Sequence, residues 1–206
     1  MLLLSLVIVI SYLIGAIPFA YLFGRLKGID LRKFGSGNIG ATNALRVLGK
    51  EIGISVLLLD MLKGFVVVVF LGDLLSLRTP NLSDDLLRII LGISAICGHI
   101  WTIFLNFKGG KGVATTFGVL LGLAIKIKGF FLVFIAVILT WIIVFLLVRI
   151  VSVSSLVAAI TLPIYILIFK PTKIFFLLSI LICLLVIWRH KSNIKRILAG
   201  KEPRLF

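Results

Sequence analysis

The sequence predicts an all-α polytopic membrane protein with about seven transmembrane helices, organised as one domain over residues 1–206. Its N-terminus is expected outside the cell and its C-terminus in the cytoplasm. Hydrophobic residues make up 61% of the chain and charged residues only 14%, and the mean hydropathy is +1.28. The apolar runs are continuous rather than alternating, which excludes a membrane β-barrel. Helices remain as the spanning structure, because an α-helix satisfies its own backbone polar groups in lipid.

The apolar runs follow one another with short polar connections. They cover residues 2–23, 52–75, 86–107, 113–125, 129–148, 150–169 and 174–188. Pro18 lacks a backbone N–H and is expected to kink the first helix near its end. The fourth run has little more than half of the roughly 20 residues that a span needs, so it is either a short span or a re-entrant segment. Residues 73–85 are expected to form a loop, with Ser83 as the cap of the third helix.

The charge of the chain is strongly positive, with 22 Lys and Arg against 7 Asp and Glu and a formal net charge of +15. In a soluble protein this would indicate nucleic acid. Here the charges lie in short loops, so membrane topology and anionic partners explain them better, and no nucleic-acid partner is expected. With the N-terminus outside, the cytoplasmic segments hold fifteen Lys and Arg and the outer loops six, Arg88 among them. This orientation brings three polar clusters to one face.

The first polar cluster, residues 35–43 with Arg46, follows the first apolar run and contains no acidic residue. Its candidate phosphate-binding residues are Gly35, Ser36, Gly37, Asn38, Thr42, Asn43 and Arg46. Glycines permit close backbone approach to a ligand, and the neutral side chains donate and accept hydrogen bonds. The planar guanidinium matches a phosphate group. The alternative is a Gly/Asn-rich turn that only caps the second helix.

The second polar cluster lies between the third and fourth apolar runs. Its candidate phosphate-binding residues are Lys108, Gly109, Gly110 and Lys111, followed by Gly112. Backbone N–H groups of the glycines would form a nest for a phosphate, with ammonium groups and a helix N-terminus beside it. A Walker A loop needs Ser or Thr after its lysine, so a nucleotide is not indicated. The alternative is a basic turn that only obeys the positive-inside rule. His99, two turns upstream, fits a packed histidine better than a catalyst.

The third polar cluster lies in the basic tail and includes His190, Asn193 and Glu202. Contacts with lipid headgroups explain the lysines of the tail but not these three residues. We expect Glu202 to pair with a tail cation, in preference to acting as a general base. Asp60 and Lys63 share a helix face at i,i+3 and can pair, either as support behind the first cluster or as a purely structural ion pair.

The chain lacks the sequence patterns of the common catalytic machineries. It has no Gly-x-Ser-x-Gly elbow and no His, Asp or Glu grouping with metal-ligand spacing, so neither a metal nor a cofactor is expected. Cys97 and Cys183 lie among apolar residues and are expected to be packing residues. An enzyme with this sequence would work through positioning and electrostatics.

Together, the three clusters resemble one family, the bacterial acyl-phosphate:glycerol-3-phosphate acyltransferases of membrane phospholipid synthesis. The matching segments are residues 35–43 with Arg46, His99 with residues 107–115, residues 189–202, and Asp60, Lys63 and Gly64. One departure is local: Trp101-Thr102 stand where the family usually has Phe-Pro, which bears on the bend of the third helix.

The resemblance implies transfer of a fatty acyl group from acyl phosphate to the sn-1 hydroxyl of glycerol 3-phosphate, giving lysophosphatidic acid and inorganic phosphate. The reaction would take place on the cytoplasmic face of the bacterial inner membrane. Acyl phosphate is already activated, so the resemblance implies direct transfer without a covalent acyl-enzyme. The implied catalytic residues are Ser36, Arg46, Lys111, His190 and Asn193, with either His190 or a substrate phosphate as proton acceptor. His190 and Asn193 are also implied to bind the substrate phosphate, together with the residues of the first two clusters. The implied partners are the two substrates and membrane lipid, and a monomer is the simplest expectation.

Two other classes of function stay open. A transporter for phosphate or phosphorylated metabolites would also use basic clusters near helix breaks. A structural scaffold would bind anionic lipid through its basic tail. The enzyme is favoured because the three clusters fall on one face and no internal repeat is visible.

Overall fold

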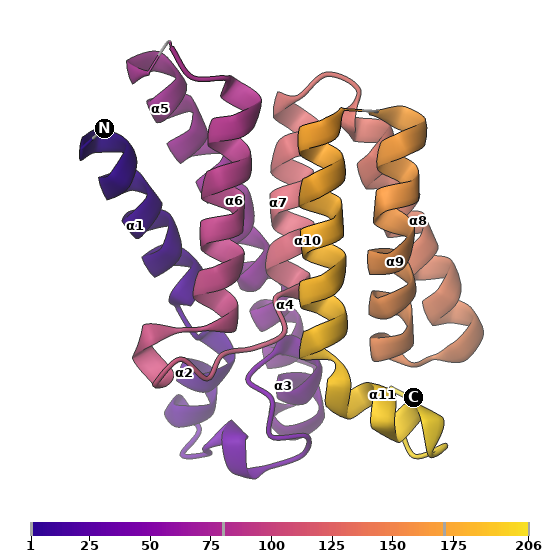
Figure 1. Cartoon of the computed structure of the whole chain (residues 1–206). Coiled ribbons are helices and arrows are strands. Elements are labelled where there is room, and N and C mark those ends of the chain that lie inside the picture. The colour runs from indigo at the N-terminus through magenta and orange to yellow at the C-terminus, as the bar shows by residue number, and fades with distance from the viewer. Residues whose placement is uncertain (1, 80, 171, 206) are drawn as a thin grey trace. The chain divides into compact units, whose positions relative to one another are not determined.

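The computed structural model describes residues 2–79, 81–170 and 172–205, and these residues form helices and connecting turns without strands (Figure 1). The all-α fold class predicted from the sequence is confirmed. The chain divides into two compact units, residues 1–123 and 124–206. The single domain expected from the sequence stays a prediction.

The helices identify a multi-pass membrane protein. Within the described residues, four helical segments are long and apolar enough to cross a membrane, or six if each of two bent helix pairs counts as one span. Helix α7 (Val113–Lys126) has 14 residues and is therefore about 21 Å long, shorter than the ~30 Å hydrocarbon core. The count of seven spans and the orientation of the termini stay predictions.

The first unit contains the helices that carry the first two polar clusters. They are α1 (Leu2–Ala16), α2 (Phe19–Leu26), η1 (Leu31–Lys33), α3 (Ala41–Leu48), α4 (Lys50–Val66), the π-helical turn η2 (Val67–Leu71), α5 (Gly72–Arg78), α6 (Asp84–Ile100), η3 (Ile103–Leu105) and most of α7. Helices α1 and α6 run side by side (Figure 1). At their crossing, a Cβ on Gly98 would overlap the Tyr12 carbonyl, so glycine permits the close approach typical of membrane helices.

Two helix ends test the expectations about proline and serine. The first apolar run breaks at Pro18, where α1 and α2 are bent by 42°, which confirms the predicted kink. The Ser83 side chain accepts a hydrogen bond from the Leu86 N–H at the start of α6, which confirms the predicted cap. The loop predicted from residue 73 is wrong, because helix continues through α5 to Arg78 and buries Leu75.

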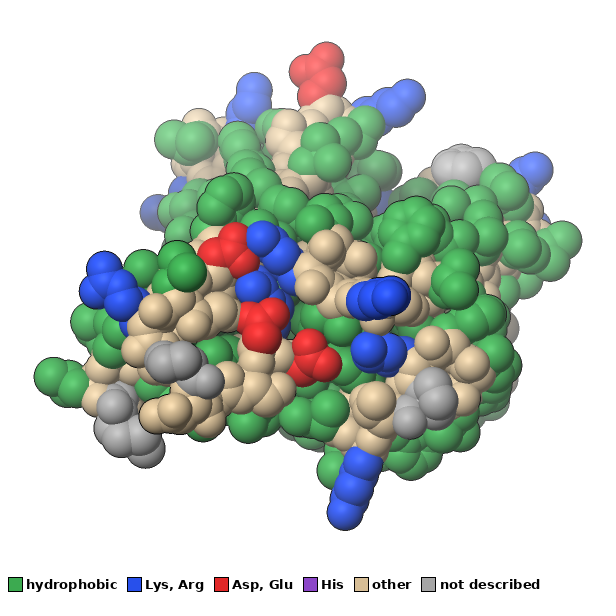
Figure 2. Space-filling model, turned by 90° about the horizontal axis from the view of Figure 1, so that it is seen from above, with side chains coloured by type: hydrophobic (Ala, Val, Ile, Leu, Met, Phe, Trp, Pro, Cys, Tyr) green, Lys and Arg blue, Asp and Glu red, His purple; other side chains and the backbone are tan. Residues whose placement is uncertain are grey.

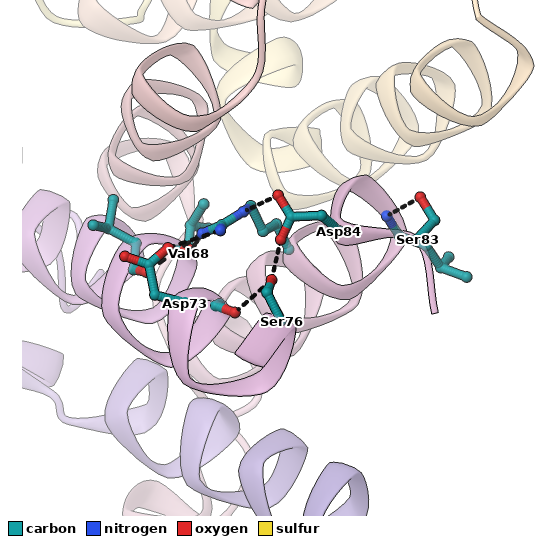
Figure 3. A network of polar contacts seen from close by, with 9 residues as sticks. Val68, Asp73, Ser76, Ser83 and Asp84 are labelled. Carbon is teal, nitrogen blue, oxygen red and sulfur yellow. Dashed lines mark hydrogen bonds and ion pairs between the residues drawn. The ribbon is translucent and has the colours of Figure 1, made fainter. Parts of the chain in front are cut away.

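Polar contacts join α5 to the start of α6 where this helix continues (Figure 3), and a buried arginine lies at their centre. Arg88 of α6 is 4% exposed, and its side chain donates to Asp84 at 2.8 Å and to Asp73 at 2.7 Å. It also donates to the Val68 carbonyl at 2.8 Å, which the π-type bond from Gly72 to Val67 leaves without its usual helical partner. Arg88 is therefore a buried, paired charge and not the outer-loop charge expected from the sequence. Figure 2 views the end of the molecule at which α6 begins and shows acidic side chains beside basic ones.

The second unit contains α8 (Phe130–Val148), α9 (Val151–Phe169), α10 (Lys173–Arg189) and α11 (Lys191–Leu198). Helix α9 packs against both α8 and α10 (Figure 1). Helix α11 is bent by 62° from α10, and the chain beyond it returns to α9, where the Leu205 N–H donates to the Arg149 carbonyl at 2.9 Å. This return places the tail residues of the third cluster against the start of α9.

Candidate phosphate-binding site

The loop of the first cluster is organised around a buried asparagine at the start of α3. Asn43 is 1% exposed. Its Oδ1 accepts the Ser36 N–H at 2.9 Å, and its Nδ2 donates to the Leu31 and Phe34 carbonyls at 3.3 and 3.1 Å. The amide thus uses both ends to hold the loop together. This corrects the expectation that Asn43 contacts a phosphate.

The remaining residues of this cluster are more accessible. Ser36 and Arg46 are exposed, and Asn38 and Thr42 are partly exposed. Gly35 and Gly37 have φ values of 60° and 69°, a left-handed backbone that favours glycine. The backbone turn therefore presents the Ser36 side chain outward, on the same loop as α3 and Arg46.

A short carboxylate cap fixes the segment just before this loop. Asp30 accepts a hydrogen bond from the Arg32 backbone N–H and pairs with the Arg32 guanidinium at 2.7 Å. The side-chain hydrogen bond from Arg32 outweighs the opposing effect of desolvation and lowers the pKa of Asp30 to about 2. Asp30 therefore stays ionised at any physiological pH and keeps η1 in place.

The second cluster forms a turn that folds back onto the end of α6. The Gly109 N–H donates to the Ile100 carbonyl at 3.0 Å and the Gly110 N–H to the His99 carbonyl at 3.1 Å. A nest of inward-pointing glycine N–H groups was expected for the phosphate, but these two groups instead satisfy the C-terminal carbonyls of α6. The glycines are required because a Cβ on Gly110 would meet the His99 ring.

The cations of the second cluster are the groups that stay accessible to a ligand. Lys108 is exposed and Lys111 is partly exposed. Helix α7 begins just beyond them at Val113, so its N-terminus adds a partial positive charge. Lys108, Lys111 and the start of α7 are therefore the anion-attracting groups of this turn.

An ionic cluster lies beneath this turn. Asp60 and Lys63 are 2% and 4% exposed, and Lys63 Nζ lies 2.8 Å from Asp60 Oδ1. This confirms the pair expected from the i,i+3 spacing. Lys63 also donates to the Ile17 carbonyl at 3.1 Å, and His99 Nδ1 lies 3.6 Å from Asp60 Oδ1. The pair thus lies beside His99 at the end of α6, and its support of the first cluster stays a prediction.

These three side chains line a narrow pocket together with Ile39 of the first cluster and Gly110 of the second. Its enclosed free volume is close to zero, against the roughly 300–1,000 Å³ of ordinary ligand sites. The pocket is therefore too small to hold a lipid substrate by itself. It shows instead that the two clusters of the first unit meet at one place.

Thr102, at the position where the resembled family has proline, has a structural role. Its hydroxyl donates to the Ala16 carbonyl at 2.6 Å and accepts the Phe104 N–H. It thereby caps η3 and satisfies a carbonyl at the break between α1 and α2. No sequence pattern indicated the Ala16 contact, because the two residues are 86 positions apart.

The third cluster is held together within the second unit. Glu202 accepts hydrogen bonds from Ser152 at 2.7 Å, from Asn193 Nδ2 at 2.5 Å and from Arg196 Nε at 2.6 Å. The expected ion pair with a tail cation is confirmed. Burial works against ionisation of Glu202, but these hydrogen bonds outweigh it and place its pKa below the usual range. The sequence did not indicate Ser152, which lies 50 residues away.

Two side chains of this cluster have a defined hydrogen-bonding orientation. His190 is 2% exposed, and its Nδ1 lies 2.8 Å from the Val186 carbonyl. Because a carbonyl only accepts, Nδ1 carries the proton of this hydrogen bond. Asn193 is 4% exposed, and its Oδ1 has no hydrogen-bond partner within the described part of the chain. Asn193 Oδ1 is therefore an acceptor atom and not an anion-binding donor.

Fold and site together define a class: a multi-pass membrane protein whose cationic loops suit a phosphorylated ligand. In residues 2–79, 81–170 and 172–205, no group of three or more His, Cys, Asp or Glu side chains is placed to hold a metal ion.

Comparison with known proteins narrows this class to one family. The model of the family described as glycerol-3-phosphate acyltransferase matches residues 5–200, and the chain belongs to this family. The glycerol-3-phosphate acyltransferase of Parasynechococcus marenigrum (strain WH8102) is 45% identical over 202 residues, covering 97% of this chain and 89% of that protein. The protein of the same name from Prochlorococcus marinus (strain NATL1A) is 44% identical over 205 residues, covering 97% of each.

Two solved structures of a membrane acyltransferase are also similar to this chain. The crystal structure of PlsY (YgiH), an integral membrane glycerol 3-phosphate acyltransferase, in its glycerol 3-phosphate form has a TM-score of 0.85 and 35% identity, covering 98% of this chain and 94% of that chain. Its lysophosphatidic acid form has a TM-score of 0.82 and 34% identity. The family resemblance inferred from the three motifs is confirmed.

Proposed function

We propose that this protein transfers a fatty acyl group from acyl phosphate to the sn-1 hydroxyl of glycerol 3-phosphate, at the cytoplasmic face of the bacterial inner membrane. The products are lysophosphatidic acid and inorganic phosphate. The observation that carries this proposal is the likeness, over 98% of the chain, to a membrane acyltransferase solved in forms with glycerol 3-phosphate and with lysophosphatidic acid. These ligands are a substrate and a product of the proposed reaction.

The cations of the first unit bind the phosphate groups in this proposal. Lys108 and Lys111 attract glycerol 3-phosphate, supported by the N-terminus of α7. Arg46 supplies a fork of donors that fits a phosphate bidentately. Ser36, on the exposed turn of the first cluster, donates to the phosphate of the acyl donor. These charges offset the repulsion between two phosphates during transfer.

The proposal assigns to Asn193 and His190 of the third cluster the groups that act on the glycerol hydroxyl. The amide nitrogen of Asn193 donates to Glu202, so its Oδ1 is the atom that faces a ligand. An acceptor oxygen suits a hydroxyl and not a phosphate, which revises the phosphate-binding role expected for Asn193. We assign His190 Nε2 a similar role, because Nδ1 is bonded to the Val186 carbonyl.

The chemistry needs no protein nucleophile. The glycerol oxygen attacks the acyl carbonyl carbon, the bond from that carbon to the phosphate oxygen breaks, and phosphate leaves. The hydroxyl proton goes to a substrate phosphate oxygen, because the basic surroundings of His190 disfavour a positive charge on its ring. Acyl phosphate is a mixed anhydride with a good leaving group, so positioning and charge neutralisation supply the catalysis.

The test uses the purified protein in detergent with palmitoyl phosphate and glycerol 3-phosphate. Release of phosphate that depends on glycerol 3-phosphate is expected, with its loss in Ser36→Ala and Lys111→Ala. Uptake of solute into liposomes without phosphate release would instead identify a transporter. Trapping of a labelled acyl-enzyme would refute direct transfer. Total loss of turnover in His190→Gln with unchanged substrate affinity would make histidine the base.

A further inference from the structure

The ionic cluster of Asp60, Lys63 and His99 has no direct part in the proposed chemistry. We propose that these three are positioning residues that hold the Lys108–Gly112 turn in place and thereby set the affinity for glycerol 3-phosphate. This inference rests on the proposed function, since it assigns that ligand to the turn.

The cluster contacts the turn through both the ring and the backbone of His99. The His99 ring lies directly beneath Gly110, where even an added methyl group would meet its Nε2. The backbone of the same histidine accepts the Gly110 N–H at 3.1 Å. Ring and carbonyl thus fix one residue of the turn from two sides. Any movement of the His99 ring is transmitted to Gly110 and its neighbour Lys111.

The His99 ring is itself held beside Asp60. Asp60 Oδ1 lies 3.6 Å from His99 Nδ1 and 2.8 Å from Lys63 Nζ. Lys63 in turn donates to the Ile17 carbonyl at 3.1 Å, at the break before Pro18. Carbonyls at a helix end in lipid need a partner. The cluster therefore links the α1–α2 break, α4 and the end of α6 in one network.

The cluster also lines the narrow pocket at which the first two polar clusters meet. Ile39 of the first cluster lines it as well as Gly110 of the second, and Ile39 is 5% exposed. The cluster therefore lies behind both loops to which the proposal assigns a phosphate. A network that only stabilised helix packing would not need to adjoin both.

The unit offers a matched comparison at the other end of α6. Arg88 is as deeply buried as Lys63, and it too pairs with carboxylates and donates to backbone carbonyls (Figure 3). Its partners lie in η2, in α5 and at the start of α6, away from Gly110. Removing this second network perturbs the packing of the same unit without touching the turn.

The experiment compares two double variants, Asp60→Asn with Lys63→Met and Asp84→Asn with Arg88→Met. Each removes two charges together, so no buried charge is left unpaired. For the first double variant we expect the KM for glycerol 3-phosphate to rise at least about tenfold while kcat changes less than about threefold, the pattern of lost ground-state binding. The KM of the second is expected to stay within about twofold of wild type. Thermal unfolding shows whether both variants lose comparable stability.

A further variant tests the contact without altering charge. Gly110→Ala pushes directly on the His99 ring and should raise the KM in the same way. The inference is overturned if the first double variant and Gly110→Ala both keep the wild-type KM, or if both double variants raise it equally. An inactive wild type would refute the proposed function instead. The inference would then be judged by the same variants on the affinity for inorganic phosphate in calorimetry.

Discussion

Glu202 organises the third cluster, and replacing it by Gln tests this role in depth. Its side chain is 5% exposed and accepts hydrogen bonds from Ser152, Asn193 and Arg196 at 2.7, 2.5 and 2.6 Å. Glutamine removes the charge and turns an NH₂ donor toward one of these donors. A hydrogen bond to a charged group contributes about 1.5–3 kcal/mol.

Not all of this energy is lost in the variant. The Arg196 side chain is 38% exposed, so water replaces part of its contact. We therefore expect Glu202→Gln to lower the free energy of unfolding by about 3 kcal/mol, which corresponds to a fall in Tm of about 6–12 °C for a chain of this size. The proposed mechanism also predicts a fall in turnover, because Glu202 no longer fixes the orientation of the Asn193 amide.

The assay is thermal unfolding of the detergent-purified protein, run beside phosphate release. Glu51→Gln is the control, because Glu51 is an exposed acid at the start of α4 and should change stability by less than about 0.5 kcal/mol. A Tm of Glu202→Gln within 2 °C of wild type, by the ~2–4 °C per kcal/mol relation, would refute the reasoning.

The pH dependence of the stability difference between wild type and Glu202→Gln gives a second check. The pKa of Glu202 in the folded protein lies below its ordinary value of 4.5. A group with a lowered folded pKa stabilises the protein above its unfolded pKa and loses this contribution as the pH falls through the folded pKa. The stability gap between wild type and Glu202→Gln should therefore be full above pH 4.5 and shrink below it.

Three further predictions concern the first unit. Lys111→Met should lower glycerol 3-phosphate-dependent phosphate release by about 100-fold or more, since a charged phosphate contact is lost; an unchanged rate would remove Lys111 from the site. Asn43→Ala leaves the Ser36 N–H without its acceptor and removes one of the two donors to each of the Leu31 and Phe34 carbonyls; it should cost about 1–3 kcal/mol, measured as a fall in Tm and faster proteolysis of residues 35–40. Gly98→Leu should abolish the yield of folded protein, because the side chain enters the space of the Tyr12 carbonyl; normal yield would contradict the described packing of α1 on α6.

Local rules of the sequence were sufficient for the helices and several of their contacts. The break at Pro18, the Ser83 cap and the Asp60–Lys63 pair each depend on residues at most four positions apart, where helix geometry fixes the neighbours. The motif residues also identified the family without the structure. The membrane makes this prediction easier, because a continuous apolar run in lipid must satisfy its backbone polar groups and does so as a helix.

Tertiary structure decided what depends on partners distant in sequence. Arg88 was counted as a loop charge because its buried carbonyl partner, Val68, lies 20 residues away. The Gly109 and Gly110 N–H groups were expected to face a phosphate, but the end of α6 folds against them and takes both hydrogen bonds. Asn43 was expected at the ligand and instead holds its own loop.

Sequence patterns were thus enough for the all-α membrane fold class, the family and the segments that carry the polar residues. Which polar atoms of those segments bond internally depends on tertiary packing. The physical reason is that a buried donor or acceptor must find a partner. Which partner it finds, as with Ser152 for Glu202 or Ile17 for Lys63, depends on how distant helices pack.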